Sequence, residues 1–158
     1  ILTVFNPYLD PTGAGYNIIQ SQIAIGSGGV YGKGYGNGAQ SHLDFIPESN
    51  TDFILAVLAE EFGLLGILFL ICLYLFILLR SSYIAYSAKD MFSRLLAGSI
   101  TLTFFMYVFV NMAMVSGLLP VIGLPLPLIS RGGTAIVTFF VCFGLLMSIQ
   151  THGRLKES

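Results

Sequence analysis

Residues 62–79 read FGLLGILFLICLYLFILL, an uncharged apolar run. Its length approaches the roughly 20 residues that a helix needs to cross a lipid bilayer. Two more uncharged runs follow at 95–129 and 132–151, and prolines interrupt the second half of the 95–129 run. We therefore predict an all-α, polytopic integral membrane helix bundle. Its three transmembrane helices are predicted at residues 53–80, 94–118 and 131–151.

The composition of the whole chain agrees with a membrane protein. Of its 158 residues, 55% are hydrophobic and 9% are charged, and the mean hydropathy is +0.83. An ordinary soluble domain has roughly a quarter of its residues charged. The composition excludes a cytosolic enzyme and a disordered segment. A net charge of −1 also excludes a nucleic-acid module, which needs a basic surface.

The proline-rich segment 119–130 separates the last two predicted helices. Proline interrupts helical hydrogen bonding and disfavours helix in the residue before it. Irregular backbone is tolerated at membrane depth only when protein or a water-filled cavity surrounds it. We predict an outer or re-entrant loop here.

The distribution of basic residues predicts the orientation in the membrane. Loop 81–93 and tail 152–158 lie on the side with five Lys/Arg residues, and the opposite side has two. By the positive-inside rule, this loop and the C-terminus are cytoplasmic, and residues 1–52 form an extracytoplasmic loop. The five are Arg80, Lys89, Arg94, Arg154 and Lys156, and the two are Lys33 and Arg131.

Two further expectations concern the ends of the spans. Residues 1–5 are interpreted as the tail of a preceding span, so the chain is expected to be the C-terminal part of a longer protein. Tyr74, Tyr83 and Tyr86 are expected to anchor the cytoplasmic interface, because Tyr is enriched there.

The predicted outer loop contains an amphipathic helix at about 16–25 and a glycine-rich run at 26–38, with seven glycines in 13 positions. The run fails the Walker pattern, because Ser27 replaces the first glycine and Gly34 replaces the required Ser or Thr. Dinucleotide binding fails as well, since no strand–helix context is present. The glycines either allow tight turns or let the backbone approach a ligand. Lys33 is a candidate partner for an anionic headgroup.

Three carboxylates, Asp44, Glu48 and Asp52, are spaced by four residues, but Pro47 disfavours a continuous helix between them. We expect them to converge in a loop above the membrane. Together with His42 they are candidate ligands for a divalent cation, although the spacing matches no strong metal signature.

Asp52 lies where the next helix begins, and two interpretations stay open. Asp is a favourable N-cap residue. Alternatively, a carboxylate beside an apolar wall and acidic neighbours has its pKa raised and can take a proton from a hydroxyl, as a general base does. Glu60 and Glu61 are expected about two turns into the span, facing a cavity or a partner. Asn111 is expected to hydrogen-bond between helices, as packing glue.

A series of ordered motifs covers essentially the whole chain. It closely resembles the SEDS family (shape, elongation, division and sporulation), in the rod-shape-determining RodA branch. The motifs are GAGYNIIQSQIAIGSGG (13–29), GKG (32–34), HLDFIPE (42–48), TDFI (51–54), AEEFG (59–63), YVFVN (107–111), MVSG (114–117), LPVIGLPLPL (119–128) and SRGG (130–133).

The resemblance implies a ten-span protein of the bacterial cytoplasmic (inner) membrane, of which this chain is the last three spans and a large outer loop. It implies polymerisation of glycan strands from lipid II on the outer face. The implied partners are lipid II, the growing strand, a class B penicillin-binding protein transpeptidase and other membrane proteins of the elongation complex. The family's essential acid corresponds to Asp52, and a second acidic position corresponds to Asp44.

Two positions depart from the family pattern. Arg131 stands where Tyr is expected, and Tyr35 stands where Trp is expected. In the implied reaction a sugar hydroxyl attacks an anomeric carbon and expels a polyprenyl pyrophosphate. Asp52 is the candidate base, and Lys33 and Arg131 are candidate cations for the leaving group. The predicted substrate-binding residues are Asp44, Glu48, Lys33, Arg131 and Glu60.

Two other classes of function compete with the glycosyltransferase. A lipid-linked precursor flippase or transporter would explain the proline-broken apolar stretch and the intramembrane acids. A non-catalytic scaffold for cell-wall synthases would need no clustered carboxylates. A divalent cation is a possible cofactor of the glycosyltransferase, and the residue spacing predicts no other cofactor.

Overall fold

The computed structural model describes residues 14–34, 52–120, 122–130 and 132–155. Within these residues the secondary structure consists of helices and contains no strand, which confirms the predicted all-α fold. Three of the helices, α4, α5 and α6, are long and apolar enough to cross a membrane. The helices are α2 (Ala14–Gly28), α4 (Ile54–Ser87), α5 (Met91–Val115) and α6 (Gly133–Leu155).

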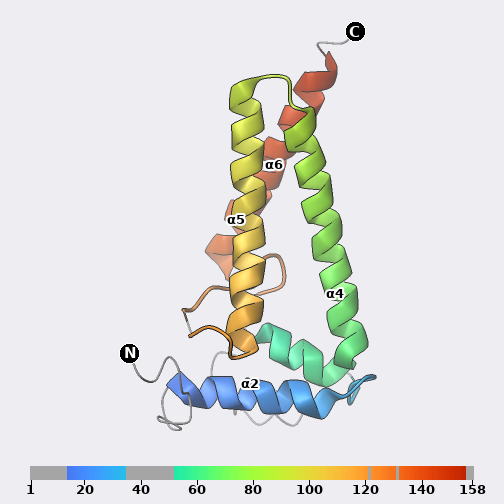
Figure 1. Cartoon of the computed structure of the whole chain (residues 1–158), viewed down its shortest axis with the longest axis vertical. Helices are drawn as coiled ribbons and strands as arrows, with labels where there is room; N and C mark the ends of the chain where they lie inside the picture. Colours follow the sequence, from blue (N-terminus) through green and yellow to red (C-terminus); the bar gives the residue numbers. More distant parts are fainter. Residues whose placement is uncertain (1–13, 35–51, 121, 131, 156–158) are drawn as a thin grey trace.

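The three long helices stand together, and α2 lies across one end of them (Figure 1). Helices α4 and α5 are antiparallel, and residues 88–90 join them at the end opposite α2. The connection is much shorter than the predicted loop 81–93. Helix α4 continues past the apolar run to Ser87, and residues 80–87 contain no Pro or Gly that would break it. There the Arg80 guanidinium lies 5.7 Å from the centre of the Tyr83 ring.

Helix α4 is broken at Gly63, where φ is 66° and ψ is −159°. We call residues 54–62 the arm of α4 and residues 64–87 its shaft. The arm (teal) runs alongside α2 at the foot of the bundle, and the shaft (green) rises from it (Figure 1). Glu60 and Glu61, which were expected about two turns into a span, lie in the arm, and Gly63 ends the arm because glycine can adopt a positive φ.

Phe104 of α5 is the central side chain of the packed interior. Its ring makes edge contacts with Tyr74 of α4, at 5.7 Å between centroids, and with Phe139 and Phe143 of α6, both at 5.5 Å. One buried ring thus contacts both neighbouring helices. Tyr74 is buried rather than interfacial, so its expected anchoring role is wrong, whereas Tyr83 and Tyr86 are exposed.

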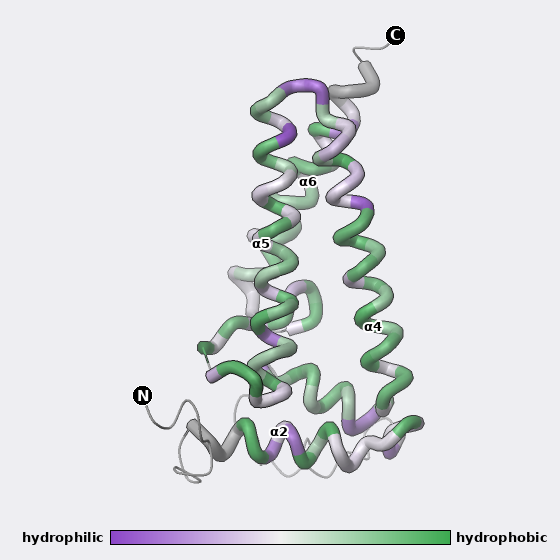
Figure 2. Tube along the Cα trace, in the orientation of Figure 1, coloured by the Kyte–Doolittle hydropathy of each residue, from purple (hydrophilic) through white to green (hydrophobic). Residues whose placement is uncertain are grey.

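The three long helices consist mostly of hydrophobic residues along their length (Figure 2). Large side chains such as Phe69, Phe76 and Phe140 are more than 60% exposed. A surface of this kind suits lipid or further protein rather than water. The structure therefore supports the predicted multi-pass membrane bundle.

Helix α2 contains the predicted amphipathic segment and extends beyond it to Gly28. Gly26 and Gly28, which the glycine pattern assigned to the loop, are its last turn. Its buried side includes Ser21, whose hydroxyl donates to the Val115 carbonyl at 2.9 Å. This bond satisfies a carbonyl at the C-terminal end of α5, where no helical amide follows. Helix α2 is thereby attached to the foot of the bundle.

Candidate functional site

Asp52 lies in a turn directly before the arm of α4 and is 8% exposed. The residue at the N-cap position of α4 is Phe53, which is fully buried. Asp52 thus precedes the assigned N-cap position by one residue, and both interpretations of Asp52 stay predictions. A buried carboxylate requires compensation from its surroundings, because burial of charge is costly.

Asn111 of α5 connects the Asp52 turn to the proline-rich loop. Its side-chain amide donates to the Asp52 backbone carbonyl at 2.9 Å and to the Leu124 carbonyl at 2.6 Å. Asn111 is fully buried, so these carbonyls are satisfied without water. One side chain thereby joins three segments that are far apart in the sequence.

Residues 122–130, which we call the covering loop, pack against Asp52. A Cβ atom added to Gly123 would lie 3.3 Å from Oδ2 of Asp52, and Gly123 has a φ of 75°. Glycine therefore serves two purposes here, the positive φ and the close approach to the carboxylate. The loop leaves α5 through a Schellman motif, in which Leu118 N–H donates to Ala113 O and Gly117 N–H to Met114 O.

The covering loop is held against the shaft of α4 by Tyr74, whose hydroxyl donates to the Pro127 carbonyl at 2.7 Å. Leu126, Pro127 and Ser130 of the loop are buried. Since Tyr74 lies well along the shaft, the middle of the loop reaches back to the bundle, while Ile122 and Ile129 are exposed. This arrangement supports the re-entrant interpretation of the proline-rich segment.

Two buried polar atoms beside these contacts have no hydrogen-bond partner among the described residues, Asn111 Oδ1 and Ser130 Oγ. Both side chains are almost completely buried. A hydroxyl and an amide oxygen in such positions can bind a hydrogen-bonding group of a ligand or a water molecule.

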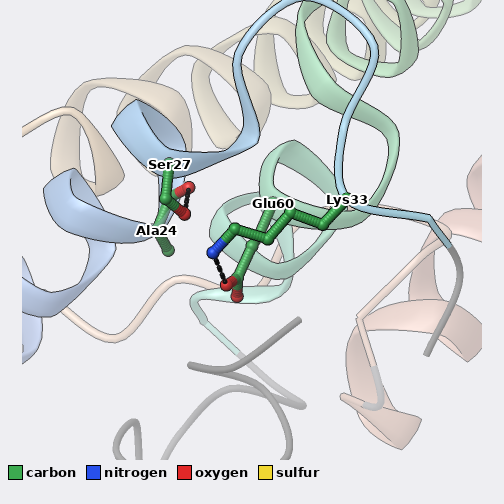
Figure 3. A network of polar contacts seen from close by, with 4 residues as sticks. All are labelled: Ala24, Ser27, Lys33 and Glu60. Carbon is green, nitrogen blue, oxygen red and sulfur yellow. Dashed lines mark hydrogen bonds and ion pairs between the residues drawn. The ribbon is translucent and has the colours of Figure 1, made fainter. Parts of the chain in front are cut away.

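Lys33 and Glu60 form an ion pair, with 3.0 Å between Nζ and Oε1 (Figure 3). The Glu60 side chain is fully buried, and that of Lys33 is 37% exposed. In the same view the Ser27 hydroxyl donates to the Ala24 carbonyl, within the last turns of α2. The structure therefore brings together two of the predicted substrate-binding residues and joins their charges to each other.

The remaining predicted site residues lie outside the described part of the chain. Asp44, Glu48, Arg131 and His42 all belong to this group, so the convergence of the outer carboxylates stays a prediction. Within residues 14–34, 52–120, 122–130 and 132–155, no cluster of three or more His, Cys, Asp or Glu side chains could hold a metal ion. The suggested divalent cation also stays a prediction.

Sequence reasoning gave too little weight to Asn111 and did not find Tyr74 or Gly123. The signal for Asn111 was an amide inside an uncharged run, and it was interpreted as packing glue. Its helix-to-loop bonds show instead that it fixes the backbone of Asp52. Tyr74 gave no distinct signal, because a tyrosine in an apolar run also suits an interface.

The sequence of the chain is similar to a protein family and to several named proteins. The family model for FtsW, RodA and SpoVE, described as a cell cycle protein, matches residues 1–155. The chain is 54% identical over 155 residues to the peptidoglycan glycosyltransferase MrdB of Escherichia coli K12, covering 98% of this chain and 42% of that protein. It is 42% identical to the peptidoglycan glycosyltransferase RodA of Treponema pallidum, covering 96% and 35%.

A probable peptidoglycan glycosyltransferase FtsW of Geobacter metallireducens is 44% identical over 152 residues, with 96% of this chain and 40% of that protein covered. Among solved structures, a chain from "Structural coordination of polymerization and crosslinking by a peptidoglycan synthase complex" superposes with a TM-score of 0.79 at 28% identity. The superposition covers 96% of this chain and 40% of that one. The chain thus spans about two fifths of the length of most of these relatives.

Proposed function

Because the chain belongs to the FtsW/RodA/SpoVE family of cell cycle proteins, we propose that it is part of a peptidoglycan glycosyltransferase. This enzyme polymerises glycan strands from lipid II during cell elongation. Relatives named as peptidoglycan glycosyltransferases, the first at 54% identity, support the proposal. The observation that carries it is the carboxylate of Asp52, buried in a turn whose backbone Asn111 holds and beside which Gly123 lies.

In the proposed reaction Asp52 is the general base. A hydroxyl of one sugar attacks the anomeric carbon of another, the new glycosidic C–O bond forms, and the bond to the polyprenyl pyrophosphate breaks. The hydroxyl proton passes to Asp52, and the electron pair leaves with the pyrophosphate. We assign charge stabilisation of the leaving group to Arg131, since Lys33 is bonded to Glu60. Asp44 and Glu48 remain proposed contacts of the substrate.

The proposed setting is the bacterial cytoplasmic membrane, with α2 and the arm of α4 on the outer face. The numbers of basic residues at the two ends of the bundle support this orientation. The proposed partner is a class B penicillin-binding protein transpeptidase, which crosslinks the strands. A structural neighbour that belongs to a peptidoglycan synthase complex supports a partner of this kind.

The test is reconstitution of the full-length parent protein with lipid II and its transpeptidase, followed by detection of glycan polymer. Asp52→Asn keeps the size of the side chain but cannot accept the proton, so polymerisation should fall by roughly 10²–10⁴. Expression, membrane insertion and partner pull-down should be unchanged.

The control is Glu61→Gln in the same arm, which removes a carboxylate but keeps the Glu61 carbonyl bonded to Gly34. Near-normal polymer from the Asp52→Asn protein would refute the catalytic role of Asp52. Movement of labelled lipid II across the bilayer without any polymer would instead favour a flippase.

A further inference from the structure

The break at Gly63 leaves helix ends that need hydrogen-bond partners. An α-helix ends with unpaired carbonyls, and the next one begins with unpaired amides. Residues 29–34, which we call the strap, supply partners for the arm of α4: Lys33 N–H donates to Glu60 O and Gly34 N–H to Glu61 O, both at 3.0 Å. The strap therefore satisfies two of the carbonyls in the last turn of the arm.

The same strap also satisfies the first amides of the shaft. Leu64 N–H donates to the Gly29 carbonyl at 3.0 Å, and Leu65 N–H donates to the Val30 carbonyl at 3.3 Å. The strap thus lies in the break with its amides toward the arm and its carbonyls toward the shaft. It replaces the hydrogen bonds that a continuous helix would have made across Gly63.

Glycines allow the strap to approach this closely. A Cβ atom at Gly32 would overlap the Glu61 carbonyl, and one at Gly63 would overlap the Gly32 amide nitrogen. At the end of α2, a Cβ atom at Gly28 would overlap the Ala59 carbonyl of the arm. In each case the opposing atom is backbone, which cannot move aside as a flexible side chain can. The fit between strap and break is therefore built into both segments.

One pair of side chains locks this backbone arrangement. Lys33 belongs to the strap and Glu60 to the arm, and their charges meet at 3.0 Å beside the backbone bond between the same two residues (Figure 3). Glu60 is fully buried. Loss of Lys33 would take a compensating charge from the buried Glu60 carboxylate, which is unfavourable because burial of charge is costly.

We propose that Lys33 and Glu60 are positioning residues, which hold the strap in the break of α4 and so fix the arm that follows Asp52. The proposal rests on the glycosyltransferase function given above. Asp52 lies eight residues before Glu60, at the other end of the short arm. If the strap leaves the break, the arm loses its C-terminal hydrogen bonds, and Asp52 moves relative to Gly123 of the covering loop. Neither residue of the pair touches the reacting atoms in this proposal.

The experiment measures strap position and activity separately in the full-length parent protein in nanodiscs. Lys33→Gln, Glu60→Gln and the double variant are compared by amide hydrogen exchange of peptides that contain residues 32–34 and 64–65. Each single variant should exchange at least about tenfold faster at these amides. Polymerisation of lipid II should fall by a similar factor, mainly in kcat, because the arm carries the base rather than a binding group.

The double variant distinguishes the loss of the ion pair from the burial of a single uncompensated charge. Because removal of both charges leaves no buried charge uncompensated, its exchange and activity should be no worse than those of the worse single variant. Lys33→Arg keeps the charge and should restore most of the protection and activity. Lys89→Gln, the same loss of a lysine at the opposite end of α4, is the matched control and should change neither.

Three outcomes would overturn the proposal. Unchanged exchange in both single variants would show that the pair does not hold the strap. Faster exchange with normal polymerisation would show that the strap does not position Asp52. Loss of activity in Lys33→Gln with normal exchange would place Lys33 on the substrate instead. Absence of polymer from the wild-type parent would refute the proposed function, while the exchange measurement would still test the role of the pair.

Discussion

At the scale of single residues, the side-chain amide of Asn111 joins three segments of this fold, whereas the Lys33–Glu60 ion pair joins two. Asn111 uses both of its N–H groups on backbone carbonyls, one at Asp52 and one at Leu124. An aspartate of similar shape could accept hydrogen bonds but not donate them to carbonyls. The chemistry of the position thus requires a donor with two hydrogens at the end of a short, stiff side chain.

Asn111→Leu, which has a similar size, should destabilise the parent protein, because two buried carbonyls lose their donor. Each unsatisfied acceptor costs about 1–3 kcal/mol. We expect a lower midpoint of thermal unfolding in detergent and weaker polymerisation, since the Asp52 backbone is no longer held. Ser116→Ala is the control, because the exposed Ser116 hydroxyl bonds only to Met112 O of its own helix among the described residues. Equal midpoints for the two variants would contradict the role of Asn111.

Residue types alone indicated the catalytic candidate but not its surroundings. Asp52 was identifiable because it comes at the start of a long apolar segment and within a familiar motif. The approach of Gly123 to its carboxylate depends on a loop more than 70 residues later in the chain. Contacts of that range are set by the path of the covering loop, which local patterns do not determine.

At the scale of helices, apolarity predicted the existence of the spans, but their ends depended on other features. The shaft of α4 follows from the uncharged run at 62–79. The break was hidden, because an isolated glycine in a helical pattern is usually tolerated. The strap shows why Gly63 ends the arm, because it supplies hydrogen-bond partners to both sides of the break. The predicted span also ended before Ser87, because hydropathy indicates which residues suit a bilayer and not where the helical hydrogen bonding of the backbone ends.

Phe104→Ala should loosen the contacts of α5 with α4 and α6, because the ring lies between Tyr74 and Phe139. Removal of a buried phenyl group leaves a cavity and costs roughly 3–5 kcal/mol. The thermal midpoint in detergent should therefore drop clearly. Phe105→Ala removes the same ring from the next residue, which is 43% exposed, and should change the midpoint much less. Similar losses for both variants would argue against a central role for Phe104.

At the scale of the whole molecule, the charge distribution predicts which end of the bundle lies on each face of the membrane. In a Cys72→Ala, Cys142→Ala background, Tyr31→Cys should react with a membrane-impermeant maleimide in intact spheroplasts, whereas Ser87→Cys should not. Tyr31 is 81% exposed beside α2, and Ser87 ends the shaft at the opposite end. The result follows from the excess of Lys and Arg near Ser87.

Permeabilised spheroplasts provide the control, since both cysteines should then react. Labelling of Ser87→Cys alone in intact spheroplasts would reverse the orientation and place Asp52 on the cytoplasmic face. That outcome would conflict with polymerisation outside the cell and would remove the support for the proposed function.

The bend in α4 also affects how a change in bilayer thickness reaches the two ends of the helix. A single straight helix would transmit any change of bilayer thickness to both of its ends, because a mismatched span tilts. Here the helix axis turns at Gly63, so the arm beside α2 is not a straight continuation of the shaft. We therefore expect a tilt of the shaft to move Asp52, at the start of the arm, less than it would move the end of a straight helix.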